Sequence, residues 1–235
     1  AGMFGSMYLL PVFAQTVLGY TAFKAGLLLM LSALLMIPIF PIGARFAQQP
    51  RSGIPIAVGM LTFGVSSLAL ARADTNCAFW LVAFWATFGR AGLGLALPSL
   101  QVGALRELSP QLLPYGAGTL NFVRMSGAAM GTGILANVLE HRAIVHNEQL
   151  FATQSERNTS TVELLDKVSS LLIEQGLSAA EQLPLAMHYL GKVITVQATG
   201  LAFKDGFLLL ALCFLVAAVS ALALTRAPSF QARPS

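Results

Sequence analysis

The sequence predicts an all-α membrane protein with six transmembrane helices and a large external loop between the fifth and the sixth. Two observations carry this prediction. Of the 235 residues, 56% are hydrophobic and only 10% are charged, whereas a soluble domain carries about a quarter of its residues as charges. The apolar residues also gather in stretches close to the about 20 residues that a helix needs to cross a hydrocarbon core. This composition excludes a water-soluble globule, and two cysteines are too few for a disulfide framework.

The six expected helices occupy residues 3–18, 26–46, 54–71, 77–97, 113–139 and 206–224. The first is short and starts almost at residue 1, so we expect the chain to begin inside a helix of a longer protein. No basic segment precedes it, so it is not interpreted as a signal peptide. The chain is therefore divided into residues 1–139 with five transmembrane helices, an external segment at 140–205, and residues 206–235 with the last helix and a cytoplasmic tail.

Basic residues in the short connecting segments indicate the orientation, because cytoplasmic loops carry an excess of Lys and Arg. If the chain enters from the cytoplasm, the inner segments hold Arg45, Arg51, Arg106, Arg226 and Arg233, and the outer turns hold only Lys24 and Arg72. This predicts a multi-pass inner-membrane protein with both ends in the cytoplasm. Residues 140–205 then lie outside it.

The external segment has its own pattern. It holds 8 of the 10 acidic residues but only 5 of the 14 basic ones, so the basic excess belongs to the apolar part and does not indicate nucleic acid. Ser160 with Glu163, and Ser178 with Glu181, match the capping box that begins a helix. Leucines and valines from Leu164 to Leu172 follow at helical spacing. We expect one amphipathic helix there, either lying on the membrane interface or docking a partner; the second is less regular because Pro184 interrupts it.

Away from the ends of the predicted spans, Arg90 and Arg124 are the only charged residues within them. Such residues are costly in lipid and are therefore candidates for function. Asn121 precedes Arg124 by three residues and shares its helix face, and Gln15 adds a polar group to the first span. These four side chains are the candidate substrate path. The alternative is that each Arg bonds to carbonyl groups of a neighbouring helix or extends to the lipid headgroups.

Glycines in two spans indicate close helix packing. Gly127 and Gly131 form a G-x-x-x-G pattern in the fifth, and Gly92 and Gly94 lie in the fourth. Small residues let helix backbones approach in a bilayer, where lipid provides no hydrophobic drive for association.

No chemistry of an enzyme is visible. All acidic residues lie outside the predicted spans, the histidines make no convincing metal pair, and no nucleotide-binding, metalloprotease or hydrolase motif occurs. We therefore expect no enzymatic activity, no cofactor and no metal. A proton carrier, if one exists, would lie outside this chain.

Two blocks resemble the fourteen-helix drug/proton antiporters of the major facilitator superfamily. Residues 10–26, with Gln15 and Gly26, look like the opening of the C-terminal half of these proteins. Asn121-Phe-Val-Arg124-Met-Ser-Gly127-Ala-Ala-Met-Gly131-Thr132 resembles the Asn-Phe-x-Arg-x-x-Gly-Gly-Ser-x-Gly-Thr signature of that half, and Arg142, His146 and Leu150 continue it. Gly92 to Pro98 resembles its glycine-rich fourth helix.

The sequence also departs from the family pattern. The loop motif Gly-x-x-x-Asp-Arg-x-Gly-Arg is matched at residues 43–51, but Ala47, Gln48 and Pro50 stand where the family has Asp, Arg and Gly. This puts a charge-relay role of that loop in doubt. In the double-glycine region, Ala128 and Ala129 are milder replacements.

The resemblance implies one half of a proton-coupled multidrug efflux transporter that works by alternating access. It implies a missing N-terminal half that carries the proton-coupling acid, amphipathic or cationic drug-like substrates, and a periplasmic membrane-fusion protein as partner. Two alternatives remain at this stage. The chain could be a membrane docking or scaffold module whose external segment binds an envelope partner, or a facilitator for a small metabolite.

Overall fold

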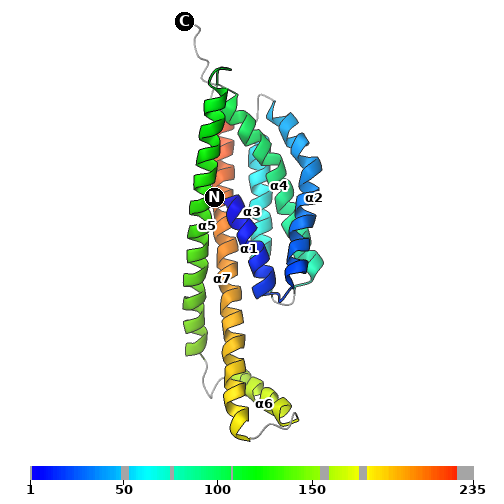
Figure 1. The fold of residues 1–235 in the computed structure, drawn as a ribbon, viewed down its shortest axis with the longest axis vertical. Helices are drawn as coiled ribbons and strands as arrows, with labels where there is room; N and C mark the ends of the chain where they lie inside the picture. Colours follow the sequence, from blue (N-terminus) through cyan, green and yellow to red (C-terminus); the bar gives the residue numbers. More distant parts are fainter. Residues whose placement is uncertain are drawn as a thin grey trace.

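The structure is a computed structural model that describes residues 2–48, 53–74, 77–106, 108–153, 159–174 and 179–226. Helices account for nearly all of these residues, and Figure 1 shows most of them side by side in an elongated bundle. The helices of the described chain are α1 (Gly2–Thr16), α2 (Ala22–Ala47), α3 (Gly53–Leu70), α4 (Phe79–Leu105), α5 (Leu113–Ala152), α6 (Thr159–Glu174) and α7 (Ala179–Arg226).

The bundle is built around α4 and α7. α4 packs against α2 and α3, and α7 packs against α3 and α5, while α1 lies against α5 and α7. The core between α1 and α7 is aromatic: the ring of Phe13, 1% exposed, lies 5.6 Å from that of Phe203 and 5.5 Å from that of Phe207 between centroids. A second cluster, formed by Phe63, Leu93 and Phe214, joins α3, α4 and α7.

Two short connections lie at the same end of the bundle, one between α1 and α2 and one between α3 and α4 (Figure 1). Gly19 has φ of 65°, a left-handed conformation that favours glycine, and the Thr21 hydroxyl accepts from the Lys24 N–H at the start of α2. The Tyr20 hydroxyl donates to the Cys77 carbonyl at 3.4 Å. Burial, and secondarily the charge of Cys77, raise the pKa of Tyr20. The two connections are thus tied together.

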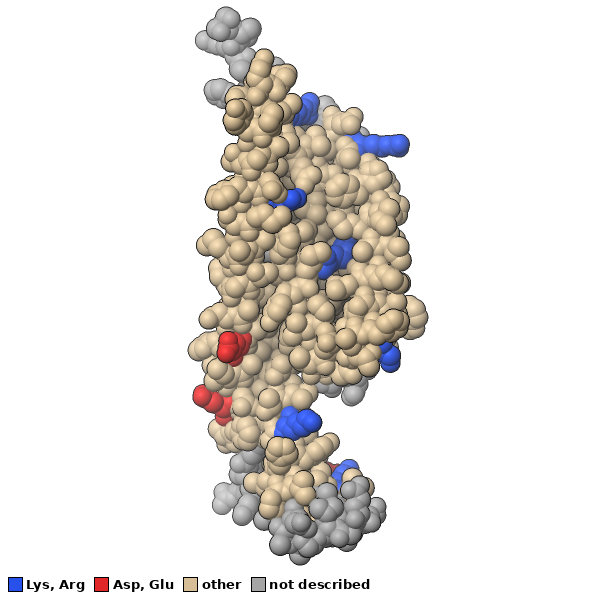
Figure 2. Space-filling model, viewed as in Figure 1, with Lys and Arg blue, Asp and Glu red and all other residues tan. Residues whose placement is uncertain are grey.

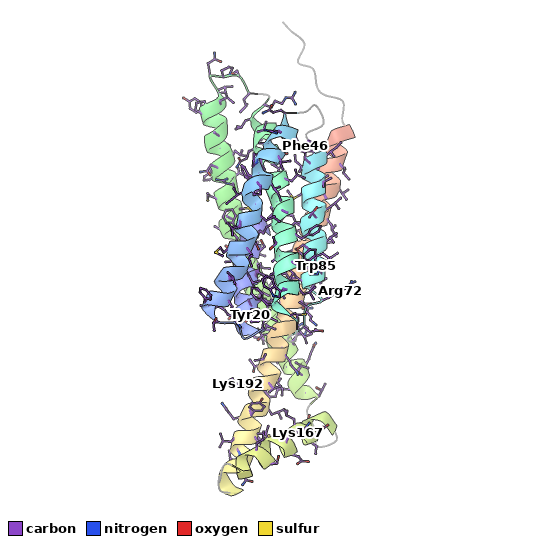
Figure 3. All side chains as sticks on the ribbon, turned by 90° about the vertical axis from the view of Figure 1, so that its right-hand side faces the viewer. Tyr20, Phe46, Arg72, Trp85, Lys167 and Lys192 are labelled. Carbon is purple, nitrogen blue, oxygen red and sulfur yellow. The ribbon has the colours of Figure 1, made fainter. Side chains whose placement is uncertain are left out.

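α5 and α7 continue past this end, and α6 lies against the extension of α7 (Figure 1). Figure 3 places Lys192 on the extension of α7 and Lys167 on α6, both beyond Tyr20 and Arg72. α6 occupies the place where the leucine spacing predicts an amphipathic helix. The expected loop differs, however, because α5 runs unbroken to Ala152 and α7 begins at Ala179. The chain becomes more polar near residue 139 and apolar again near residue 206. The backbone hydrogen bonds of a helix do not depend on the polarity of its side chains, so α5 and α7 continue through these points.

The fourth helix also differs from its predicted bounds. Residues 98–105 were expected in a link, yet they belong to α4, with Pro98 buried inside it. Proline is tolerated in transmembrane helices because neighbouring groups can satisfy the freed backbone. The neighbouring Ser99 hydroxyl lies 3.2 Å from the carbonyl oxygens of Leu95 in the same helix and of Gly43 in α2, and so joins α4 to α2.

Among the described residues, five helices are long and apolar enough to cross a membrane: α2, α3, α4, α5 and the part of α7 at residues 184–223. α1 has 15 residues, fewer than the about 20 that span a hydrocarbon core. The structure therefore supports five spans by length and composition, and a sixth crossing at α1 stays a prediction. Figure 2 shows a largely uncharged face, with its acidic side chains confined to the lower part.

Candidate transport site

Asn121 and Arg124 form a polar pair on α5. The Arg124 Nη2 donates a hydrogen bond to Asn121 Oδ1 at 2.7 Å. A separation of three residues puts both side chains on one helix face, as the sequence predicts. Both residues are exposed, and their neighbour Phe122 is 71% exposed. The pair therefore lies on a face of α5 that the described helices leave uncovered.

Arg90 is placed differently. It is 7% exposed, and its Nη2 is buried without a hydrogen-bond partner among the described residues. Ala86, one turn before it on α4, belongs to the aromatic core around Phe13, and Leu93, three residues after it, belongs to the second cluster. Arg90 thus sits between the two apolar cores. Nη2 therefore does not bond to a carbonyl group of a neighbouring described helix.

Gln15 lies in the last turn of α1 and does not join the other three. Its Nε2 donates to the carbonyl of Pro11, in the same helix, at 3.2 Å, and its side chain is exposed. The last turn of α1 lies at the end of the bundle opposite to the start of α5 (Figure 1). Of the four candidate path residues, the structure brings only Asn121 and Arg124 together; Gln15 and Arg90 remain separate from them in the described hydrogen bonds.

The glycines of α4 bring this helix close to α3 and to α2. A Cβ added to Gly92 would lie 2.5 Å from the carbonyl oxygen of Gly59 in α3, so the two backbones are in direct contact there. A Cβ added to Gly94 would lie 3.2 Å from Met36 and 3.3 Å from Ile39 in α2. On α5, Gly127 and Gly131 are half-buried. The glycines of α4 therefore set its distance to α3 and α2.

A groove of about 650 Å³ runs between α2 and α4. Its lining is apolar apart from one threonine and consists of Leu31, Leu34, Leu35, Trp80, Ala83, Phe84, Thr87 and Phe88. This groove was not predicted from the sequence. The signal that could have found it is the aromatic spacing of Trp80, Phe84 and Phe88, which repeats every four residues along one helix face.

A cluster of charges joins α7 to its neighbours next to the two connections. Asp205 accepts a hydrogen bond from Arg142 Nε at 2.6 Å and lies 2.8 Å from His146 Nε2. The adjacent Lys204 pairs with Asp74 at 2.6 Å. The sequence points to Arg142 and His146 only through the family resemblance. Asp205 and Asp74 were missed as partners, since their contacts join residues far apart in the chain.

Comparison with known proteins gives relatives of one kind. The chain is 20% identical over 211 residues, 88% of its length, to the uncharacterized MFS-type transporter YhcA of Bacillus subtilis. It is 25% identical over 90% of its length to the fatty acid resistance protein FarB of Neisseria gonorrhoeae. It is also 25% identical over 60% of its length to the multidrug transporter protein MdtP of B. subtilis.

The chain is related to the transporters of the major facilitator superfamily. The matched region spans 39% of YhcA, 40% of FarB and 26% of MdtP, so the chain covers well under half of each relative's length. No family model matches, and no solved structure matches. YhcA and MdtP are transporters by their names rather than enzymes, which is consistent with the lack of catalytic motifs.

Proposed function

We propose that this chain is one lobe of a proton-coupled multidrug efflux transporter of the inner membrane, working by alternating access. The Asn121–Arg124 pair carries the proposal. An arginine and an amide among the exposed apolar side chains of Phe122, Val123 and Met125 are costly against acyl chains. They are stable where they face a water-filled path or a second lobe, which is where a transporter of this type handles its substrate.

The names of the relatives support efflux as the activity. MdtP is a multidrug transporter, and FarB confers fatty acid resistance by its name. From these names and from the resemblance we infer that the substrates are amphipathic or cationic drug-like compounds. The other lobe would be the missing N-terminal half that the resemblance implies.

Proton coupling needs a carboxylate that the described spans do not supply. In the described parts of α1 to α4 and their connections, the acidic residue is Asp74, which pairs with Lys204 near a helix end. In α5 and α7 the described acids begin at Glu140 and end at Asp205, on the side of the extension. We therefore assign the proton-carrying acid to the other lobe.

The test is dye export by the intact transporter in cells. Replacing Arg124 by Ala breaks the 2.7 Å bond to Asn121 and removes the charge, so we expect export to fall at least about tenfold with unchanged protein level in the membrane. The matched control is Arg45→Ala, an exposed arginine in the last turn of α2, which should export normally. Full export by the Arg124 variant would remove the pair from the mechanism.

The extension gives a second proposal, docking of a periplasmic membrane-fusion protein. On α6, Leu171 is 59% and Val162 is 40% exposed, although the helix packs against α7. We expect Leu171→Glu to abolish capture of the partner by the intact transporter in a pull-down, because a charge at an apolar interface is costly. Asp166→Lys, an exposed position of the same helix about 140° around it from Leu171, is the control. Capture that survives the Leu171 change would reject α6 as the docking element.

A further inference from the structure

A smaller pocket lies between the end of α3 and the start of α4. Its volume is about 260 Å³, and its walls are aliphatic side chains together with Arg72, Cys77 and Trp85. Arg72 is exposed and Trp85 is half-buried, and Figure 3 shows both at the end of the bundle where the two short connections lie. The pocket therefore combines one cationic group with an apolar wall.

The length of α3 places this pocket at the membrane surface. α3 has 18 residues, about 27 Å at 1.5 Å per residue, which is close to the about 30 Å of a hydrocarbon core. Arg72 follows the last residue of α3 by two positions, so it lies at the level of the lipid headgroups. The adjoining surface of α4 presents Trp80, Leu81 and Phe84, all exposed. Tryptophan is enriched at this boundary, and the apolar surface below it suits acyl chains.

The pocket is preformed, but its charged group is not paired. The Ser66 hydroxyl donates to the carbonyl of Trp85 at 2.6 Å, which joins α3 to α4 at the pocket. Asp74, two residues after Arg72, pairs with Lys204 instead. Within the described part of the chain, the Arg72 guanidinium has neither a hydrogen-bond partner nor an ion-pair partner. Its N–H groups are therefore available to an anion.

An aromatic cluster connects this pocket to the groove between α2 and α4. Trp85 lines the pocket, whereas Phe84 and Phe88 line the groove. The ring of Trp85 lies 5.3 Å from that of Phe84 and 5.9 Å from that of Phe88 between centroids. The three rings thus form one continuous wall that leads from the pocket at the membrane surface into the apolar groove.

We propose that Arg72, its pocket and this aromatic wall bind an anionic phospholipid. The phosphate lies on the Arg72 guanidinium, whose planar N–H groups match phosphate oxygens, and an acyl chain lies along Trp85, Phe84 and Phe88. Because the charge of Arg72 is uncompensated, a headgroup with a net negative charge is favoured over a zwitterionic one. The inference goes beyond the proposed efflux function, since it concerns a lipid that stays with the protein rather than an exported compound.

The test uses the two tryptophans of the chain, since both lie at the proposed site. Trp80→Phe leaves Trp85 as the reporter. The purified full chain is reconstituted in phosphatidylcholine bilayers, and phosphatidylglycerol or phosphatidylcholine with brominated acyl chains is added in steps to quench the fluorescence. We expect brominated phosphatidylglycerol to quench at a mole fraction at least about fivefold lower, the effect of one arginine near an anionic headgroup. Equal quenching by the two lipids would overturn the proposal.

Variants assign the preference to Arg72. Arg72→Gln should abolish the preference for phosphatidylglycerol and leave quenching by phosphatidylcholine unchanged. Arg72→Lys keeps the charge without the planar donors and should retain part of the preference. Lys24→Gln is the matched control, because Lys24 is an exposed cation at the same end of the bundle that lies over the Tyr20 ring; it should keep the full preference. Equal loss in the Lys24 and Arg72 variants would indicate a general attraction to surface charge and reject the site.

A competition experiment separates a lipid from a free phosphate. Unbrominated phosphatidylglycerol should restore the fluorescence of Trp85. An excess of sn-glycerol 3-phosphate, which presents a phosphate without acyl chains, should leave the quenching as it is. Fluorescence restored by glycerol phosphate would assign the pocket to a soluble anion and refute the lipid site.

Discussion

The contact between α3 and α4 gives the most direct quantitative prediction. A Cβ on Gly92 would lie 2.5 Å from the carbonyl oxygen of Gly59 and 2.8 Å from Cβ of Thr62. An ordinary C···O contact is about 3.3 Å or longer, so Gly92→Ala requires the two helices to separate by about 0.8 Å. Backbone atoms cannot rotate away as a flexible side chain can.

The cost follows from overpacking, which destabilises by about 1–3 kcal/mol. Alanine recovers up to about 1 kcal/mol because glycine is a poor helix former. With a clash of about 2 kcal/mol and a recovery of about 1 kcal/mol, the net loss is about 1 kcal/mol. For a chain of this length each kcal/mol lowers the melting temperature by about 2–4 °C, so we expect Gly92→Ala to melt about 2–4 °C below the wild type.

The measurement is thermal unfolding of the detergent-purified chain, followed by the loss of the monodisperse peak in size-exclusion chromatography. Gly133→Ala is the matched control, because an added Cβ at Gly133 in α5 meets nothing within 4 Å. It gains helix propensity without a clash and should melt at or above the wild-type temperature. If Gly92→Ala melted as high as Gly133→Ala, the backbone contact between α3 and α4 would not exist as described.

Two further predictions concern the charged cluster and the orientation. Asp205→Asn removes the ionic contacts to Arg142 and His146 and should lower stability by about 1 kcal/mol, as expected for a partly exposed pair. In the Asp205→Asn background, Arg142→Gln should then add little further loss of stability, and full additivity of the two changes would contradict the pairing. As a control, Glu163→Gln, on exposed α6, should leave the melting temperature unchanged. For orientation, a membrane-impermeant maleimide added to intact cells should label half-buried Cys77 in a Cys213→Ala background. A cysteine at Gln48, at the other end of the bundle, should react only after permeabilisation, and the reverse pattern would invert the predicted topology.

The sequence predicts the helices well where the signal is local. The spacing of Asn121 and Arg124 places both side chains on one face, and the structure joins them by a hydrogen bond. The repeat of leucines after residue 160 predicts a helix where α6 lies. Both cases depend only on neighbours within one turn, which the sequence contains.

Helix ends and long-range contacts are a different matter. The predicted boundary near residue 139 follows a loss of apolar residues, but α5 continues to Ala152 because its hydrogen bonds are internal to the helix. Whether Arg90 is buried depends on how α2 and α3 pack against α4, and the pair of Lys204 with Asp74 joins residues 130 apart. Neither can be found from spacing along the chain.

The two sides of the bundle differ in a way that bears on where lipid lies. On α7, Leu212, Val216 and Val219 are 61%, 58% and 66% exposed, and residues 206–223 hold no charged side chain. This surface meets acyl chains at no cost. The exposed face of α5 instead presents Arg124 and Asn121, and a charged side chain in the bilayer centre costs about 2.5–3.5 kcal/mol even on insertion scales.

That difference orients the chain in the membrane. If the α5 face met lipid, the energy of Arg124 would have to be offset by snorkelling, yet its Nη2 is already directed to Asn121 Oδ1. If the exposed face of α7 met a second lobe, an uncharged apolar surface would be covered by protein, although this surface is already stable against acyl chains. The arrangement of lower free energy has the exposed face of α7 toward lipid and the polar pair of α5 toward the protein interior, which agrees with the proposed role of the chain as one lobe of an exporter.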